Sequence, residues 1–258
     1  MAEGAQLIAY EAPLNERIRT FLRLEHLFAQ YRHYQRDRSV AGARSMLHTL
    51  IDILTLLSKS DYKAEIIKEL GEQQANLAKL ASRSGVDQHA LRYILDEINS
   101  ALNAMQQLST QLVGTALRDN EFLLSVQNRF TLPGGTCSFD APALHHWLSR
   151  PMADVQRSLD QWFADLSPFD QCIGLYLRLL RQSTEPTVEL ARTGMFVYTP
   201  DSAYLLVRVL VDPKLDVYPE ISAGRHRFSV RFMQQRDINQ SARQAAMDIT
   251  FRLHCCLL

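Results

Sequence analysis

The 258-residue chain has few of the features that assign a sequence to a biochemical class. It has four cysteines, and none of them forms the C-x-x-C pair typical of zinc sites and redox motifs. H-E-x-x-H, G-x-S-x-G and a glycine-rich loop ending in Gly-Lys-Ser/Thr are all missing. Enzyme signatures are therefore scarce, and the sequence predicts neither a cofactor nor a metal.

An excess of charge and a long apolar run are also missing. The 28 basic residues balance the 28 acidic ones, so overall charge favours neither nucleic acid nor an anionic membrane as a partner. No uninterrupted apolar stretch approaches the roughly 18 residues needed to cross a bilayer. The first residues lack the basic and apolar regions of a signal peptide. These observations predict a cytoplasmic location without membrane insertion.

The first two thirds of the chain have helical periodicity. Apolar residues recur at steps of three and four, which indicates amphipathic helices. The first expected helix begins at Pro13 and Asn15 and has an arginine-rich outer face. Three further long helices are expected at 39–57, 61–80 and 87–112, and shorter ones at 121–129, 141–148, 152–166 and 168–182. Short loops between them favour a helical layer or bundle.

After Gln182 the hydrophobic period changes to two, which is typical of strands. The expected strands are Thr187–Tyr198, Ala203–Val211, Arg225–Met233 and Met247–Cys255. A short strand at 3–10 is expected to join the sheet. The pattern predicts an α+β fold, with a mainly helical domain over residues 1–183 followed by a small, mainly antiparallel β domain over residues 184–258.

The stretch from Gly224 to Phe232 combines a core face with a basic face. Apolar Phe228, Val230 and Phe232 alternate with Arg227, Ser229 and Arg231, so the two arginines are expected on one strand face, roughly 13 Å apart. That separation suits an extended or helical peptide better than a single carboxylate. The alternative interpretation is the solvated outer face of an antiparallel sheet.

One alternative is a thiol enzyme. Cys137 lies in a turn before a helix start, where a thiolate is stabilised, and His145 follows eight residues later. Such a site needs a base within hydrogen-bond reach, and a packed structural cysteine is the competing interpretation. A second alternative is a nucleic-acid adaptor that uses the arginine face, which the neutral composition disfavours.

Three blocks of the sequence resemble the ZapD family of bacterial cell-division proteins. They are Pro13–Glu25, Pro133–Asp140 with Leu144–Leu148, and Tyr218–Ser222 with Arg227–Phe232. They span almost the whole chain and follow the family's order. The run Gly194–Tyr198 departs from the family pattern, as does the extension Leu257–Leu258.

The resemblance implies a cytoplasmic, non-enzymatic factor that acts at the mid-cell division ring. Such a factor binds the carboxyl-terminal peptide of the tubulin-like GTPase FtsZ, bundles FtsZ protofilaments and stabilises the Z-ring as a homodimer. On this basis we expect a basic surface that captures the FtsZ tail, built by Arg227, Arg231, Lys59, Lys63 and Arg23.

Overall fold

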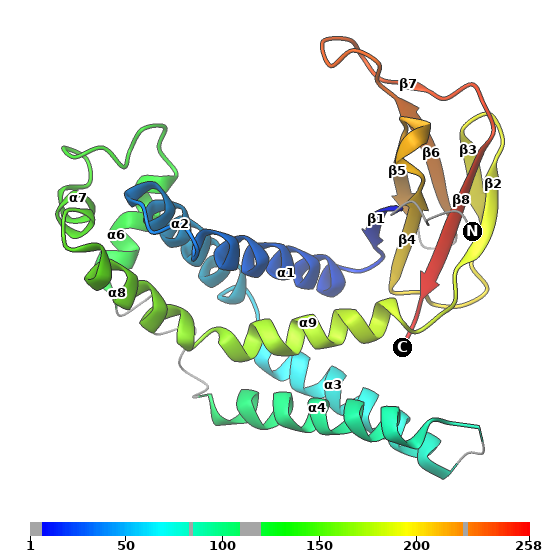
Figure 1. Ribbon diagram of the computed structural model, residues 1–258, viewed down its shortest axis with the longest axis horizontal. Coiled ribbons are helices and arrows are strands. Elements are labelled where there is room, and N and C mark those ends of the chain that lie inside the picture. Colours follow the sequence, from blue (N-terminus) through cyan, green and yellow to red (C-terminus); the bar gives the residue numbers. More distant parts are fainter. Residues whose placement is uncertain (1–6, 83–84, 109–119, 224–226) are drawn as a thin grey trace. The chain divides into compact units, whose positions relative to one another are not determined.

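The chain folds as an α+β protein whose helices precede most of its strands (Figure 1). The structure is a computed structural model that describes residues 7–82, 85–108, 120–223 and 227–258. It divides into two units, and the divisions fall within the first and last long helices. The helical unit is Arg23–Tyr176, and the β-unit joins the residues up to Leu22 to Leu177–Leu258.

The helices follow the predicted periodicity closely. They are α1 Glu16–Tyr34, α2 Val40–Leu57, α3 Tyr62–Ala78, α4 Gln88–Gln107, α6 Glu121–Phe130, α7 Pro142–Leu148, α8 Met152–Ala164 and α9 Ser167–Arg181. Short 3-10 helices lie at Lys79–Ser82 (η1) and Pro213–Leu215 (η2). The expected end of the fourth helix, at 109–112, lies outside the described residues.

Side-chain caps explain where several helices begin. Asn15 Oδ1 accepts a hydrogen bond from the Ile18 N–H at 2.8 Å, and Asp61 Oδ1 accepts one from Ala64 at 3.1 Å. Asp87 accepts from both His89 and Ala90. Each cap satisfies an amide at a helix start that has no partner within the helix. The predicted start signals at Asn15 and Asp61 are therefore confirmed.

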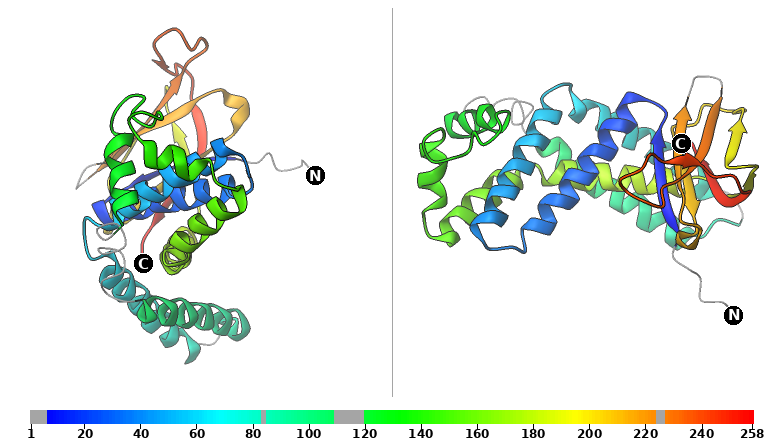
Figure 2. Two further views of the ribbon diagram at one scale, coloured as in Figure 1. Left: turned by 90° about the vertical axis from the view of Figure 1, so that its left-hand side faces the viewer. Right: turned by 90° about the horizontal axis from the view of Figure 1, so that it is seen from above.

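The helical unit has an aromatic and aliphatic core. Tyr31 on α1 stacks on Phe163 of α8 with ring centroids 4.0 Å apart, and its hydroxyl donates to the Leu159 carbonyl at 3.0 Å. In the described part of the chain, α2 is the one helix that is long and apolar enough to cross a membrane, and over half of it is buried in the protein. Helices α3 and α4 lie side by side (Figures 1 and 2).

The β-unit contains two antiparallel sheets. Sheet A has the order β1-β4-β8-β2, with β1 Ile8–Pro13, β4 Leu206–Val211, β8 Ile249–Cys256 and β2 Thr187–Ala191. Sheet B has the order β3-β6-β5, with β3 Met195–Tyr198, β6 Phe228–Gln234 and β5 Tyr218–Ala223, and the short β7 Arg243–Gln244 also pairs with β6. A shared core of alternate residues from both sheets includes Val209, Phe228, Val230, Phe232 and Phe251.

The strand predictions need three corrections. The expected strand Thr187–Tyr198 is two strands, because Thr193 and Gly194 have φ values of 46° and 74° and turn the chain from sheet A to sheet B. A Cβ at Gly194 would lie 2.5 Å from the Ala245 carbonyl oxygen, so the turn requires glycine. β5 and β7 were not predicted.

The third correction concerns the first strand. It runs from Ile8 to Pro13 rather than over 3–10, and it pairs with β4. The expected residues 3–6 lie outside the described part of the chain, as do Gly224–His226 of the arginine-rich stretch. Pro13 is the last residue of the strand and does not start the helix. It lies opposite Leu206 at a position where β1 makes no hydrogen bond to β4, so the missing N–H of proline is tolerated there.

Candidate partner-binding surface

The outer face of β6 presents Arg231, as the alternation predicted. Phe228, Val230 and Phe232 are at most 1% exposed, whereas Arg231 is exposed. Arg227 is also exposed and lies just before the first residue of the strand. Both guanidinium groups therefore belong to a solvent-facing surface, while the alternate residues hold the sheet to the core.

The neighbours of Arg231 give this face a mixed character. The residues directly opposite it are Met195 on β3 and Glu220 on β5, and Glu220 is exposed. Directly opposite side chains in an antiparallel pair have Cβ atoms about 5 Å apart. The basic face thus contains a carboxylate beside Arg231, which reduces its net positive potential.

Apolar side chains complete the same face. Val197 on β3 is 54% exposed, and Met195 and Met233 are half-buried. Sequence reasoning missed the contributions of Glu220 and Tyr218 because Pro219 hid the strand that carries them. The resulting face, which we call the β6 face, comprises Met195, Val197, Tyr218, Glu220, Ser222, Arg227, Ser229, Arg231 and Met233. It offers cations and apolar contacts to an extended ligand.

The other three expected binding residues belong to the helical unit. Lys59 is exposed in the turn between α2 and α3, and Arg23 is exposed on α1. Lys63 is only half-exposed, since its Nζ donates a hydrogen bond to the Leu108 carbonyl at the end of α4. Arg227 and Arg231 lie in the β-unit, so a single surface made by all five residues remains a prediction.

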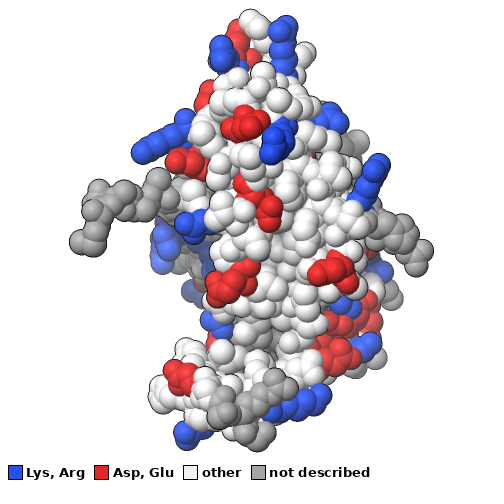
Figure 3. All heavy atoms as spheres, turned by 90° about the vertical axis from the view of Figure 1, so that its right-hand side faces the viewer, with Lys and Arg blue, Asp and Glu red and all other residues white. Residues whose placement is uncertain are grey.

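Basic side chains on the face drawn in Figure 3 are dispersed among acidic ones. Lys and Arg stand apart there and do not form one continuous patch. This distribution agrees with the equal numbers of basic and acidic residues in the whole chain. Electrostatic recognition on this face would have to act through individual side chains.

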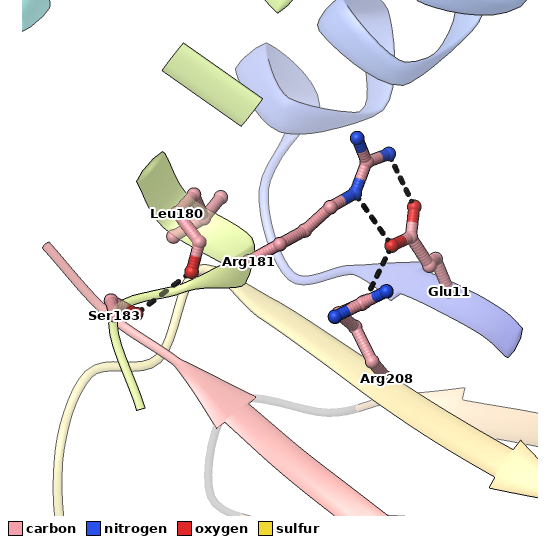
Figure 4. A network of polar contacts seen from close by, with 5 residues as sticks. All are labelled: Glu11, Leu180, Arg181, Ser183 and Arg208. Carbon is pink, nitrogen blue, oxygen red and sulfur yellow. Dashed lines mark hydrogen bonds and ion pairs between the residues drawn. The ribbon is translucent and has the colours of Figure 1, made fainter. Parts of the chain in front are cut away.

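A second pair of arginines in the β-unit serves the fold (Figure 4). Arg181 at the end of α9 donates from Nε and Nη2 to the two carboxylate oxygens of Glu11, each at 2.8 Å. Arg208 on β4 donates from Nε to Glu11 Oε1 at 2.7 Å. The three side chains are only 18–22% exposed. We call this group the Glu11 cluster; it ties β1 to β4 and to the end of α9.

The pKa of Glu11 reflects this arrangement. Burial alone would raise the pKa, but the hydrogen bonds and charges of Arg181 and Arg208 outweigh it and hold the pKa below its ordinary value. Glu11 is therefore ionised at neutral pH. Nothing in the sequence points to this cluster, because its members are 170 and 197 positions apart.

The Cys137 thiol lies beside a carboxylate rather than beside the histidine that the sequence suggested as its partner. The hydrogen-bond partner of the Cys137 thiol is Asp140 Oδ2 at 3.4 Å, whereas His145 is an exposed residue on α7. Burial raises the pKa of Cys172 and of Cys255 to about 12, so both thiols stay protonated at neutral pH. Among the described residues, no three His, Cys, Asp or Glu side chains are grouped so that they could hold a metal ion.

Comparison with known proteins gives a consistent result. The family model described as "ZapD: Cell division protein" matches residues 22–231. The chain is similar to the cell division protein ZapD of Methylococcus capsulatus, with 39% identity over 97% of this chain and 98% of that protein. It is 37% identical to ZapD of Photobacterium profundum over 87% of this chain and 90% of the relative. For ZapD of an Azoarcus species, the identity is 35% over 98% of this chain and all of the relative.

Proposed function

This chain belongs to the ZapD family of cell-division proteins, and from that premise we propose that it binds FtsZ through the FtsZ carboxyl-terminal peptide. In this proposal it crosslinks and bundles FtsZ protofilaments and promotes assembly and stability of the Z-ring. It acts in the cytoplasm at mid-cell, as a protein-binding factor rather than an enzyme. Its role in cell division follows from the family itself.

The observation that carries the proposal is the β6 face. Arg231 projects from β6, whose other face is buried in the core, and Arg227 immediately precedes that strand. Exposed Val197 and half-buried Met195 lie beside them. On this face the arginines can pair with acidic groups of a peptide tail, and the valine and methionine side chains can contact its apolar groups. Lys59, Lys63 and Arg23 of the helical unit are further proposed contacts for the tail.

Bundling adds a physical requirement. One molecule must hold two filaments at once, and a symmetric homodimer meets that requirement by duplicating a single tail-binding site. Two linked sites also raise the apparent affinity for a filament lattice, because the second binding event is intramolecular. We therefore propose that the functional form is a homodimer.

The test is co-sedimentation with polymerised FtsZ. Full-length FtsZ and FtsZ lacking its carboxyl-terminal peptide are pelleted with this protein at low and high salt, and the pellets are imaged by electron microscopy. We expect co-pelleting and bundles with full-length filaments, and loss of both on tail deletion. Added salt should weaken the binding, because exposed charge pairs are screened. Failure to pellet with full-length filaments at low salt would contradict the proposal.

A further inference from the structure

A histidine of β8 lies in line with the Glu11 cluster. His254 is directly opposite Arg208 of β4, and Arg208 is directly opposite Glu11 of β1. Directly opposite residues of an antiparallel pair share one face of the sheet, with Cβ atoms about 5 Å apart. The preceding residue, Leu253, belongs to the buried core, so alternation directs His254 to the other face of sheet A. The imidazole therefore extends the row of the Glu11 cluster by one strand.

The segment that connects α9 to β2, residues 182–186, lies along this part of β8. Thr184 Oγ1 donates a hydrogen bond to the Cys255 carbonyl at 3.2 Å. The segment then continues into β2, whose first residue is paired with Leu253. Cys255 and Leu253 are the two neighbours of His254 in the chain. The connecting segment is therefore held to β8 on both sides of the imidazole.

One nitrogen of the His254 ring is buried in this arrangement. The residue is half-buried, and no residue that the structure describes makes a hydrogen bond with its Nδ1 atom. A neutral ring can leave Nδ1 unprotonated, whereas both ring nitrogens carry a proton in the charged ring. A protonated Nδ1 at this position is a buried donor without a partner, which destabilises the closed arrangement. Uptake of a proton therefore requires that water reach Nδ1.

The charges around His254 also disfavour a second proton on the ring. Burial has the largest effect and the positive charge of Arg208 the next, and together they hold the pKa of His254 below the ordinary value of 6.5 for a histidine. Two groups of the connecting segment act in the opposite direction but do not outweigh them. The titratable and charged groups of the surrounding elements are Arg208 of β4, Arg252 and Cys256 of β8, Glu185 and the Thr184 carbonyl of the connecting segment, Arg181 of α9 and Glu11 of β1.

We propose that His254 is an acid-sensitive switch of the β-unit, in which uptake of a proton by the imidazole releases the connecting segment from β8 and admits water to Nδ1. The closed form has the lower pKa, so the open form takes up the proton first as the pH falls. Closure is therefore favoured fully above about pH 6.5, and it weakens as the pH falls from there through the pKa of the closed form. The switch needs no partner and can be tested on the purified protein.

Labelling of Cys256 measures the opening. This cysteine is fully buried, lies two residues after His254 on the same face of β8 and is next to Thr184. Wild type and His254→Gln are treated with 4,4′-dithiodipyridine, which reacts with thiols at acid pH, and the labelled sites are located by mass spectrometry. Comparison of the two proteins at one pH removes the effect of pH on the thiol itself.

The rate at which Cys256 is labelled should depend on pH only while His254 is present. At pH 5.5, one unit below the ordinary histidine pKa, protonation of the open form favours opening by up to about tenfold. We therefore expect the ratio of the wild-type rate to the His254→Gln rate to be about three- to tenfold higher at pH 5.5 than at pH 7.5. The control is His26→Gln, since His26 is exposed on α1. Its rate should stay equal to that of the wild type at both pH values.

Buried Cys172 of the helical unit distinguishes local opening from unfolding of the whole protein. Its labelling should be the same in wild type and His254→Gln. A rate ratio for Cys256 that does not change with pH would overturn the switch, and so would an equal rise for Cys172. If His254→Gln does not fold, the rate of Cys256 relative to Cys172 is followed in the wild type alone. It should rise about three- to tenfold from pH 7.5 to pH 5.5, and a constant value would contradict the proposal.

Discussion

Two pairs of arginines in the β-unit have opposite environments. Arg181 and Arg208 are about one-fifth exposed and donate to the Glu11 carboxylate, whereas Arg227 and Arg231 are exposed on the β6 face. A half-buried guanidinium that loses its carboxylate leaves an uncompensated charge, so its partner is needed for stability. An exposed guanidinium contributes little to folding and is available to a ligand. Arginine content therefore identifies a binding surface only when burial is known.

Removing the shared carboxylate is the strongest test of this difference. We expect Glu11→Gln to lower the free energy of unfolding by about 2–4 kcal/mol at neutral pH, because two neighbouring guanidinium groups lose their counter-charge. Urea denaturation followed by far-UV circular dichroism measures the change. The control is Glu16→Gln, since Glu16 is 85% exposed and its pair with Arg19 should contribute under about 1 kcal/mol. Equal losses in the two variants would contradict a structural role for the Glu11 cluster.

Acid pH should remove the same contribution without a mutation. The folded-state pKa of Glu11 is below the ordinary value of 4.5 for a glutamate, so the unfolded state binds a proton first as the pH falls. The stabilisation from Glu11 is complete above the unfolded-state pKa and is lost as the pH falls through the folded-state pKa. The difference in unfolding free energy between wild type and Glu11→Gln should therefore shrink below about pH 4.5. A constant difference between pH 6 and pH 3 would show that ionisation is not its source.

The exposed pair should behave in the opposite way. We expect Arg227→Ala combined with Arg231→Ala to weaken binding of the FtsZ tail by about tenfold, while unfolding free energy changes by no more than about 1 kcal/mol. Fluorescence anisotropy and urea denaturation provide the two measurements. Arg192→Ala combined with Arg252→Ala removes the same charge from other exposed positions of the β-unit and should leave binding close to wild type. If the double variant unfolds, Arg227 and Arg231 are needed for folding, and their assignment to the binding surface is wrong.

Two lysines of the helical unit, Lys63 and Lys59, should also differ in how much they contribute to stability, but by a smaller amount. Lys63 donates to the Leu108 carbonyl, whereas Lys59 is exposed in a turn. We expect Lys63→Met to lower the unfolding free energy by about 0.5–1.5 kcal/mol, and Lys59→Met to change it by less than about 0.5 kcal/mol. Thermal and urea denaturation of the two single variants measure both losses. A larger loss for Lys59→Met than for Lys63→Met would contradict a structural role for the Lys63 hydrogen bond.

Local patterns accounted for the helices and for the two faces of β6. Caps such as Asn15 and Asp61 act within one helical turn, so they can be recognised in the sequence. The alternation of Phe228, Val230 and Phe232 likewise identified the buried face before the partner strands were known. Each of these predictions depends on residues close together in the chain.

The missed elements depend on distant partners. β5 contains Pro219, which normally argues against a strand, and it is tolerated because β5 is an edge strand with Pro219 at a non-hydrogen-bonded position. The turn at Thr193–Gly194 is hidden by alternation that continues on both sides of it. The place of His254 beside Arg208 could not be predicted either, because β4 and β8 pair only when sheet A is assembled.

The sequence by itself determined which residues are buried along each element, because apolar periodicity and capping act over a few residues. Its resemblance to ZapD also identified the family correctly. Only the tertiary structure decided which strands are edges, and which arginines meet a carboxylate. The reason is that strand pairing and the Glu11 cluster join residues up to 197 positions apart. Buried charges and backbone groups whose partners lie that far away in the chain produce no pattern among neighbouring residues of the sequence.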